Sequence, residues 1–351
     1  MATREYRGLA YRNNADLAAW LAKRPAEAAL EPDLPIIDPH HHLWHTEARG
    51  LYFLPELLKD LGGGHNIVST VFLECQAMFR AGGPEEMKPV GEIEFVVGQA
   101  AIADSGQFTR TRVCEGIIGW ADLMQGAKVR EVLEAEIAAG GGRFRGVRYG
   151  TSWDEGIAGK FVSRAMTRHR LLDPKLREGF AVLGKMGLTF DSWHFHPQLP
   201  DLIDLARAFP DTTIICDHVG GALGVGQYAG KRDEVTAAWK KSIAELARCP
   251  NVNMKLGGLG MTSFGFGFEF GDAPPSSETL AETWRPYIET CIEAFGPNRC
   301  MFESNFPPDK QSCGYTELWN AFKHGTKTGS ADEKRALYSG TAARVYKLKV
   351  P

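Results

Sequence analysis

Residues 35–42 read Pro-Ile-Ile-Asp-Pro-His-His-His, and this stretch decides how the rest of the chain is interpreted. A short apolar run that ends in ligand-type side chains is typical of a buried parallel strand opening into a site. Because side chains alternate along a strand, His40 and His42 share one face and His41 points to the other. Two imidazoles on one face can both reach a single metal ion. The stretch therefore predicts a strand that ends at a metal site.

Seven more short apolar runs follow, separated by longer stretches with the apolar periodicity of helices. Eight strands with helices between them is the count of a (β/α)₈ TIM barrel, an α/β fold. A doubly wound sheet is the alternative, but no Gly-x-Gly-x-x-Gly motif follows the first strand. The expected strands are 35–39, 67–75, 116–121, 144–149, 188–194, 212–216, 252–256 and 300–303.

Two segments lie outside this regular alternation. Residues 1–34 are expected to form an N-terminal extension, with a short helix that begins near Asn14 and the barrel domain following over 35–351. The extension could cover the barrel or pack on a partner subunit, so a homo-oligomer is an open expectation. Residues 257–277, rich in Gly and Phe, follow the seventh strand and are too long for a simple connection. We expect a lid-like loop there.

The composition excludes several classes of protein. The 351 residues are 44% hydrophobic and 24% charged with a net charge of −3, which argues against a disordered chain or a general nucleic-acid binder. No polybasic stretch or 18-residue apolar run suggests a membrane. The seven cysteines are scattered without any Cys-x-x-Cys, and the N-terminus lacks an apolar signal region. A cytoplasmic protein with a small-molecule substrate is the expectation.

Ligand-type side chains also end other strands, and in a parallel barrel these ends meet at one mouth. Glu74 ends the second strand, although a buried Glu tied to an arginine is nearly as plausible. The fifth strand ends in a second His-x-His, in which His196 is preferred, and His218 ends the sixth. The expected metal ligands are His40, His42, Glu74, His194, His196, His218 and Asn305. The expected catalytic residues are Asp309, Asn305 and His218.

Three further residues are expected to bind the substrate. Arg148, at the end of the fourth strand, could hold a substrate carboxylate with two hydrogen bonds. An ion pair with Glu74 or Asp154 is the equally weighted alternative for Arg148. Lys255 could act as a point charge, and Trp44 could face an apolar or ring-shaped ligand. No Gly-x-Ser-x-Gly elbow or phosphate-binding loop competes with the metal interpretation.

These strand-end residues resemble the amidohydrolase superfamily, specifically its amidohydrolase-2-type branch of lactonases, related hydrolases and decarboxylases. Residues 38–42 look like the His-x-His of that family, and His196 and His218 match its strand-five and strand-six histidines. The segments around Lys255 and over 340–346 also look like family features. The resemblance covers about residues 35 to 348. It implies a (β/α)₈ barrel with metal-assisted or metal-free hydrolysis at the strand ends.

One position departs from the family pattern. The family usually has an Asp at the end of strand eight, where this chain has Asn305 in Glu-Ser-Asn-Phe-Pro. A neutral amide can coordinate a cation through its carbonyl, but it cannot act as a general base. Either Asp309, Glu74 or a histidine replaces the base, or the reaction is not ordinary hydrolysis.

The sequence therefore leaves several functions open. The preferred one is hydrolysis of a small carboxylated lactone, ester or amide by water activated on a divalent metal, with zinc, manganese or iron and one or two ions. The alternative is a dinuclear iron or iron–manganese oxygenase, a hydroxylase in which Glu74 bridges the ions. Non-oxidative decarboxylation and a binding-only protein are the remaining hypotheses.

Overall fold

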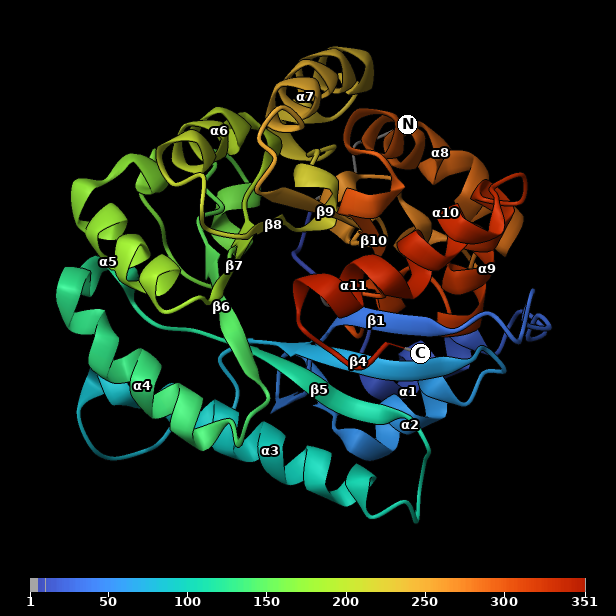
Figure 1. Ribbon diagram of the computed structural model, residues 1–351. Helices are drawn as coiled ribbons and strands as arrows, with labels where there is room; N and C mark the ends of the chain where they lie inside the picture. Colours follow the sequence, from blue (N-terminus) through green and yellow to red (C-terminus); the bar gives the residue numbers. More distant parts are fainter. Residues whose placement is uncertain (1–5, 10, 351) are drawn as a thin grey trace.

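The computed structural model describes residues 6–9 and 11–350. Eight parallel strands form one sheet, in the order β1-β4-β5-β6-β7-β8-β9-β10, with helices around it (Figure 1). The chain after β10 closes the ring, because Phe306 bridges His41 and the Asn305 N–H donates to the His40 carbonyl at 2.9 Å. This arrangement confirms the predicted (β/α)₈ barrel.

Each expected strand overlaps an observed one, because strands buried on both faces read as continuous apolar runs. The boundaries differ most at the third strand of the barrel, which is expected over 116–121 and begins four residues earlier. The barrel strands are β1 (Ile36–His41), β4 (Ile67–Leu73), β5 (Arg112–Gly119), β6 (Phe144–Gly150), β7 (Thr189–Trp193), β8 (Ile214–Cys216), β9 (Val252–Leu256) and β10 (Cys300–Phe302).

The helices begin where the sequence supplies caps. In α5, the Asp173 side chain accepts from the backbone N–H of Lys175, and Pro174 occupies the first turn. Leu176 and Phe180 then recur at helical spacing and are buried against the barrel. The larger helices are α3 (Val90–Asp104), α4 (Val129–Ala139), α5 (Pro174–Lys185), α6 (Leu199–Ala208), α7 (Arg232–Leu246), α8 (Ser277–Phe295) and α9 (Tyr315–Gly325). The shorter ones are α1 (Asn14–Leu21), α2 (Leu54–Leu61), α10 (Ala331–Arg335) and α11 (Thr341–Val345).

A small hairpin follows β1 and was not predicted. Its strands β2 (Trp44–Thr46) and β3 (Gly50–Tyr52) pair antiparallel, and each is only three residues long. Three residues are too few to show a period-two pattern in a sequence. The hairpin matters because it carries Trp44 and Arg49 to the mouth of the barrel.

The C-terminal segment closes the opposite end of the barrel. Tyr346 is fully buried, and its hydroxyl donates to Asp191 Oδ1 at 2.6 Å inside the ring of strands. In Figure 1, α11 crosses this end of the molecule. The strand C-termini are therefore the accessible end of the barrel.

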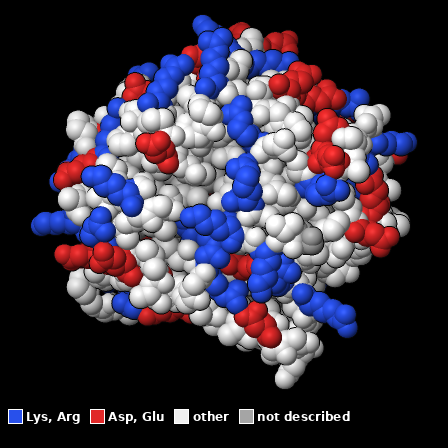
Figure 2. Space-filling view, in the orientation of Figure 1, with Lys and Arg blue, Asp and Glu red and all other residues white. Residues whose placement is uncertain are grey.

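The surface on this side of the molecule carries charges of both signs. In the orientation of Figure 1, lysine and arginine side chains run in a band through the middle of the view, with acidic groups mainly toward its edges (Figure 2).

Within residues 6–9 and 11–350, no helix combines the length and apolar character that crossing a bilayer requires.

Helix α4 buries a carboxyl group on its apolar face. Glu136 follows Val129, Val132 and Leu133 on that face, and a Cβ at Gly119 of β5 would lie 3.2 Å from its Oε1. No side chain among the described residues hydrogen-bonds to either carboxyl oxygen. Burial, together with the nearby Glu92 carboxyl group, raises the pKa of Glu136 well above its ordinary value.

We expect Glu136→Gln to remove a pH dependence of stability. The folded state keeps a proton that the unfolded chain releases near a pKa of about 4.3, so wild-type stability falls as the pH rises above that value. The slope from one such group reaches about 1.4 kcal/mol per pH unit below the folded-state pKa. Urea unfolding between about pH 4 and pH 7 measures it.

The matched control is Glu131→Gln, which changes an exposed glutamate on the same helix. It should keep the wild-type pH profile, whereas Glu136→Gln should be flatter. Parallel profiles for all three proteins would show that Glu136 is already ionised in the fold.

Candidate active site

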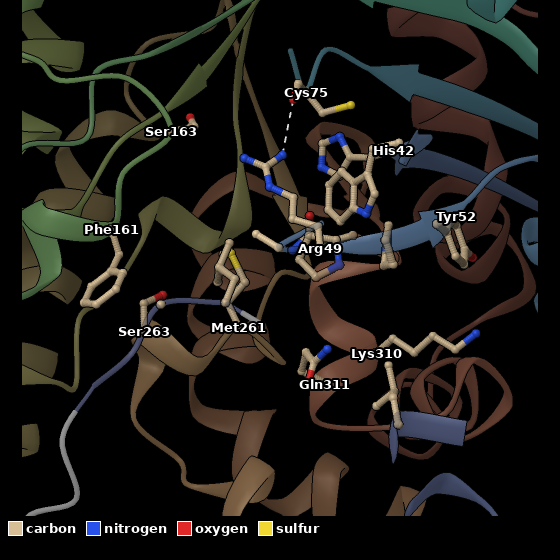
Figure 3. Close-up of a pocket in the computed structure, with 18 of the residues that line it drawn as sticks. His42, Arg49, Tyr52, Cys75, Phe161, Ser163, Met261, Ser263, Lys310 and Gln311 are labelled. Carbon is tan, nitrogen blue, oxygen red and sulfur yellow. Dashed lines mark hydrogen bonds between the residues drawn. The ribbon is translucent and has the colours of Figure 1, made fainter. Parts of the chain in front are cut away.

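A cavity of about 860 Å³ opens at the C-terminal ends of the strands. Figure 3 shows His42 and Arg49 on its wall, with Met261 and Ser263 on another side. Five of its lining residues come from the ends of different strands: His42, Arg148, Trp193, His218 and Asn305. The cavity therefore occupies the position at which barrel enzymes carry their sites.

Three histidines at this end are oriented in the same way. Nδ1 of His40 lies 2.7 Å from one oxygen of Glu303, and Nδ1 of His218 lies 2.7 Å from the other. Nδ1 of His42 lies 2.9 Å from the Leu73 carbonyl oxygen. When an oxygen acceptor holds the proton on Nδ1, the Nε2 lone pair of the ring is left free. His42 therefore carries its proton on Nδ1, as a metal-ligating histidine does. The two oxygens of Glu303 favour the same tautomer for His40 and His218, and Lys255 Nζ also lies 3.3 Å from His40 Nδ1.

The distance between two of these nitrogens suits a shared ion. His40 Nε2 and His42 Nε2 are 3.2 Å apart. Two ligands about 2.1 Å from one tetrahedral ion lie about 3.4 Å apart. Burial lowers the pKa of His218 to about 3 and the pKa values of His40 and His42 well below normal, so the rings are neutral. Neutral imidazoles suit zinc, manganese or iron.

Arg148 lies beside these rings and is held by Glu74. Arg148 Nε donates to Glu74 Oε1 at 3.0 Å, and Arg164 donates to the other oxygen at 3.0 Å. Burial alone would raise the pKa of Glu74, but the Arg164 and Arg148 guanidinium groups hold it below its usual value. The Nη1 atom of Arg148 lies 3.4 Å from His40 Nε2. Glu74 thus lies in an arginine ion pair, apart from the histidine cluster.

Asn305 and Asp309 form a buried pair at the cavity wall. Asn305 Nδ2 donates to Asp309 Oδ1 at 2.6 Å, and the Gly260 N–H donates to Asp309 Oδ2 at 2.7 Å. Asn305 lines the cavity, and its Oδ1 stays available as an acceptor because its Nδ2 is engaged. Burial raises the pKa of Asp309 well above its ordinary value. Both oxygens of Asp309 are occupied by these donors.

Comparison with known proteins agrees with this geometry. Residues 37–348 match the Amidohydrolase family. The chain belongs to that family. It is 30% identical over 338 residues to protein y4mH of Sinorhizobium fredii, covering 90% of this chain and 99% of that one. It is 26% identical over 330 residues to an L-fucono-1,5-lactonase of Burkholderia multivorans, covering 90% and 97%.

Solved structures share the fold. An amidohydrolase from Burkholderia multivorans with bound zinc superposes with a TM-score of 0.67 at 24% identity, covering 90% of this chain and 99% of that chain. A dihydroxybenzoic acid decarboxylase from Polaromonas with bound manganese superposes with a TM-score of 0.53 at 12% identity, covering 89% and 96%. Structural neighbours of this amidohydrolase are therefore known with either metal.

The histidines after β7 lie apart from the cluster. His194 Nδ1 lies 3.1 Å from the Ser192 hydroxyl, and His196 Nδ1 accepts from the Leu223 N–H at 3.2 Å. Strand alternation turns Trp193 into the cavity, where its ring centroid is 4.8 Å from that of His218. Because side chains alternate along the chain here, His194 points to the opposite side from Trp193, away from the cavity.

The three expected substrate-binding residues have different surroundings. Lys255 is fully buried, with Nζ 2.7 Å from Asp191 and 3.1 Å from Asp217, and it does not line the cavity. Trp44 does line it and stacks on His42 at a centroid distance of 5.5 Å. Arg148 lines the cavity while its Nε is engaged by Glu74.

Sequence reasoning missed Glu303, which orients two of the three histidines. It directly follows β10 and is fully buried. Burial raises its pKa to about 8, against the opposing charge of Lys255. The available signal was a carboxylate after a buried apolar strand, which needs a partner to be tolerated.

Two consecutive glycines make room for this arrangement. A Cβ at Gly257 would lie 2.4 Å from Glu303 Cγ, and one at Gly258 would lie 2.4 Å from His218 Cγ. Gly258 also has φ +65°, which glycine adopts without strain. The Gly-Gly after β9 therefore allows Glu303 and His218 to approach each other.

Proposed function

We propose that this chain is a metal-dependent hydrolase that opens a carboxylated lactone, or cleaves a related ester or amide, with water. The observation that carries the proposal is the shared orientation of three neutral histidines, each with Nδ1 within 2.9 Å of an oxygen atom. The lactonase relative and the zinc-containing structural neighbour support it.

We assign His40, His42 and His218 as the residues that would hold the ion. A bound divalent cation polarises a carbonyl group and lowers the pKa of water toward neutrality. Glu303 fixes the ring orientation of His40 and His218 through its two oxygens. When bound by these rings, the cation would favour the ionised form of Glu303.

The surrounding residues then position the reactants. Arg148, immobilised by Glu74, presents Nη1 beside His40 and can donate to the carbonyl oxygen of the substrate. Asn305 Oδ1 can orient a water by accepting its hydrogen bond, but it cannot take the proton. In place of the base expected at Asp309, we propose that Asp309 positions the Asn305 amide. Lys255, Glu74, His194 and His196 are outside the proposed set of contacts to metal and substrate.

The contacts around the histidines support the oxygenase and decarboxylase hypotheses less well than hydrolysis. Across residues 6–9 and 11–350, one cluster of three His, Cys, Asp or Glu ligand atoms lies close enough to hold an ion, and it contains His40, His218 and Glu303. It shares His40 and His218 with the assigned ligands, and we add His42 because its Nε2 lies 3.2 Å from His40 Nε2. Glu74, the bridge that a dinuclear oxygenase would need, is held by two arginines. Decarboxylation could use the same histidines, so product analysis must separate it from hydrolysis.

The direct test follows ring opening in a set of carboxylated lactones, with zinc, manganese or iron supplied. Hydrolysis releases one proton per ring opened, which a pH indicator reports, and chromatography identifies the hydroxy acid. Oxygen uptake or release of carbon dioxide without ring opening would contradict the proposal in favour of an oxygenase or a decarboxylase.

Arg49 is the guanidinium that we expect to bind the substrate carboxylate. It lies over Trp44 at 4.9 Å from the ring centroid, and its Nη1 donates to the Cys75 carbonyl at 3.2 Å (Figure 3). We expect Arg49→Met to lower kcat/KM for a carboxylated lactone about tenfold, the loss of one charge-assisted hydrogen bond. The corresponding carboxamide should lose less than about threefold.

The matched control is Arg80→Met, which removes an exposed arginine paired with Glu94. It should leave both substrates unchanged. Equal losses for the carboxylate and the carboxamide with Arg49→Met would show that Arg49 does not recognise the charge.

A further inference from the structure

Residues 6–9 and 11–21, called the N-terminal segment here, lie at the mouth of the cavity and are hydrogen-bonded on two sides of it. On one side, Thr262 Oγ1 donates to the Gly8 carbonyl at 2.6 Å, and Trp20 Nε1 donates to the Gly271 carbonyl at 2.8 Å. On the other side, Asn14 Nδ2 donates to the Leu51 carbonyl of β3 at 2.8 Å. The segment therefore joins the loop after β9 to the hairpin and forms a wall of the cavity.

Gly8 shows how closely this wall packs. A Cβ at Gly8 would lie 2.8 Å from the Phe161 ring, and its φ of +86° also favours glycine. The neighbouring Tyr6 ring meets the Phe161 ring edge to face at 5.3 Å. The wall thus continues across the mouth to Phe161.

Beyond its inner end, the cavity has mostly apolar side chains along the N-terminal segment, whereas charged side chains, among them Lys59, Asp60 and Lys310, line other parts of it. Figure 3 shows Phe161 and Met261 on the side away from Tyr52. Leu9, Leu51 and Phe161 keep 36%, 36% and 42% of their surfaces exposed, although they are large apolar side chains. The apolar lining of this outer part comprises Leu9, Leu17, Leu21, Leu51, Phe161 and Met261. Exposed apolar side chains gathered around one cavity mark a binding surface.

The four phenylalanines of the loop after β9 do not supply this lining. Phe264 and Phe266 pack against Tyr287 of α8, with centroid distances of 6.2 and 6.0 Å, instead of facing the cavity. The same loop contributes Met261 and Ser263 to the cavity. The apolar surface near the substrate is therefore built mainly by the N-terminal segment and the hairpin.

We infer that the substrate carries an apolar substituent that extends from the reacting group and lies against this N-terminal wall. The cavity of about 860 Å³ is in the range that holds a drug-sized ligand, with the histidines and Arg148 confined to its inner end. The inference rests on the proposed hydrolysis for the placement of the reacting group. It adds a substrate class: a lactone or ester with an alkyl or aryl chain.

The test uses δ-lactones with alkyl chains of increasing length, from δ-hexalactone to δ-dodecalactone. Complete burial of a methylene group is worth about fourfold in binding, so a partly open wall should raise kcat/KM about threefold per methylene. In Leu9→Asn/Leu51→Asn, we expect the increase to fall below about 1.5-fold per methylene.

The matched control is Leu30→Asn/Leu172→Asn. These leucines are 37% and 39% exposed, close to the values of Leu9 and Leu51, and do not line the cavity. This variant should keep the wild-type dependence on chain length. Thermal unfolding of both double variants checks that each is folded.

A binding measurement separates failure of this inference from failure of the proposed hydrolysis. Calorimetric titration with 5-hydroxyalkanoates of the same chain lengths needs no turnover. Affinity that rises with chain length in the wild type and the control variant, but not in Leu9→Asn/Leu51→Asn, supports the apolar wall even if no lactone is hydrolysed. Affinity independent of chain length in the wild type overturns the inference, whatever the activity.

Discussion

His40→Ala is expected to lower kcat/KM for lactone hydrolysis about 1,000-fold, the equivalent of about 4 kcal/mol of transition-state stabilisation. His40 is the ring that contacts the other members of the site: His42 at 3.2 Å, Glu303 at 2.7 Å and Arg148 at 3.4 Å. Its removal takes away one proposed ligand and the partner that faces the free nitrogen of Arg148. Initial rates on a carboxylated lactone measure the effect.

The control for this prediction is His45→Ala. His45 lies in the neighbouring hairpin strand β2 and is exposed. It should retain wild-type activity and metal content. Retention of more than about a tenth of the activity by folded His40→Ala would remove His40 from the proposed catalytic centre.

Lys255→Met is expected to cost about 3 to 5 kcal/mol in the free energy of unfolding. Lys255 is fully buried between Asp191 and Asp217, with Glu303 also raising the pKa of its ammonium group. Methionine fills a similar volume but leaves these carboxyl groups without their cation. Urea unfolding at neutral pH measures the loss.

Two variants make this result specific. Lys240→Met removes an exposed lysine of α7 and should change stability by less than about 0.5 kcal/mol. Asp191→Asn combined with Lys255→Met should recover part of the loss, since one buried carboxyl group is neutralised. A loss below about 1 kcal/mol for Lys255→Met alone would mean that these acids are already protonated in the folded protein.

The fold could be predicted from the sequence because parallel strands buried on both faces leave a plain signal. β1, β4 and β9 appear as short apolar runs, and the helices between them have capping residues and apolar periodicity. The order of strands around the barrel then follows from the chain order, since adjacent strands pair in parallel.

The site was less predictable because it depends on side-chain phase and on contacts far apart in the chain. Alternation placed His40 and His42 on one face, but at β7 the inward residue is Trp193 and not His194. Glu303 contacts His40 although it lies 263 positions further along the sequence, and no local sequence pattern predicts that contact. Arg49 lies in the turn between β2 and β3, two strands that are too short to show a period.

The extension before the barrel gave no sign of its contribution to the cavity. Its helix α1 was expected, but its contacts are single hydrogen bonds to backbone carbonyls such as those of Leu51 and Gly271. Every residue has a backbone carbonyl group, so the amino-acid sequence does not show which carbonyl will accept such a hydrogen bond. That the segment forms a cavity wall could therefore be found only in three dimensions.

Metal content measured beside activity tests the central proposal most directly. The wild-type protein and His40→Ala are prepared with zinc, manganese and iron supplied, and each is analysed for metals and for lactone hydrolysis before and after chelation. The proposal predicts about one equivalent of metal in the wild type, little in His40→Ala, and activity that is lost with the metal and restored by adding it back. Wild-type protein that hydrolyses lactones at full rate after chelation, without measurable metal, would contradict it.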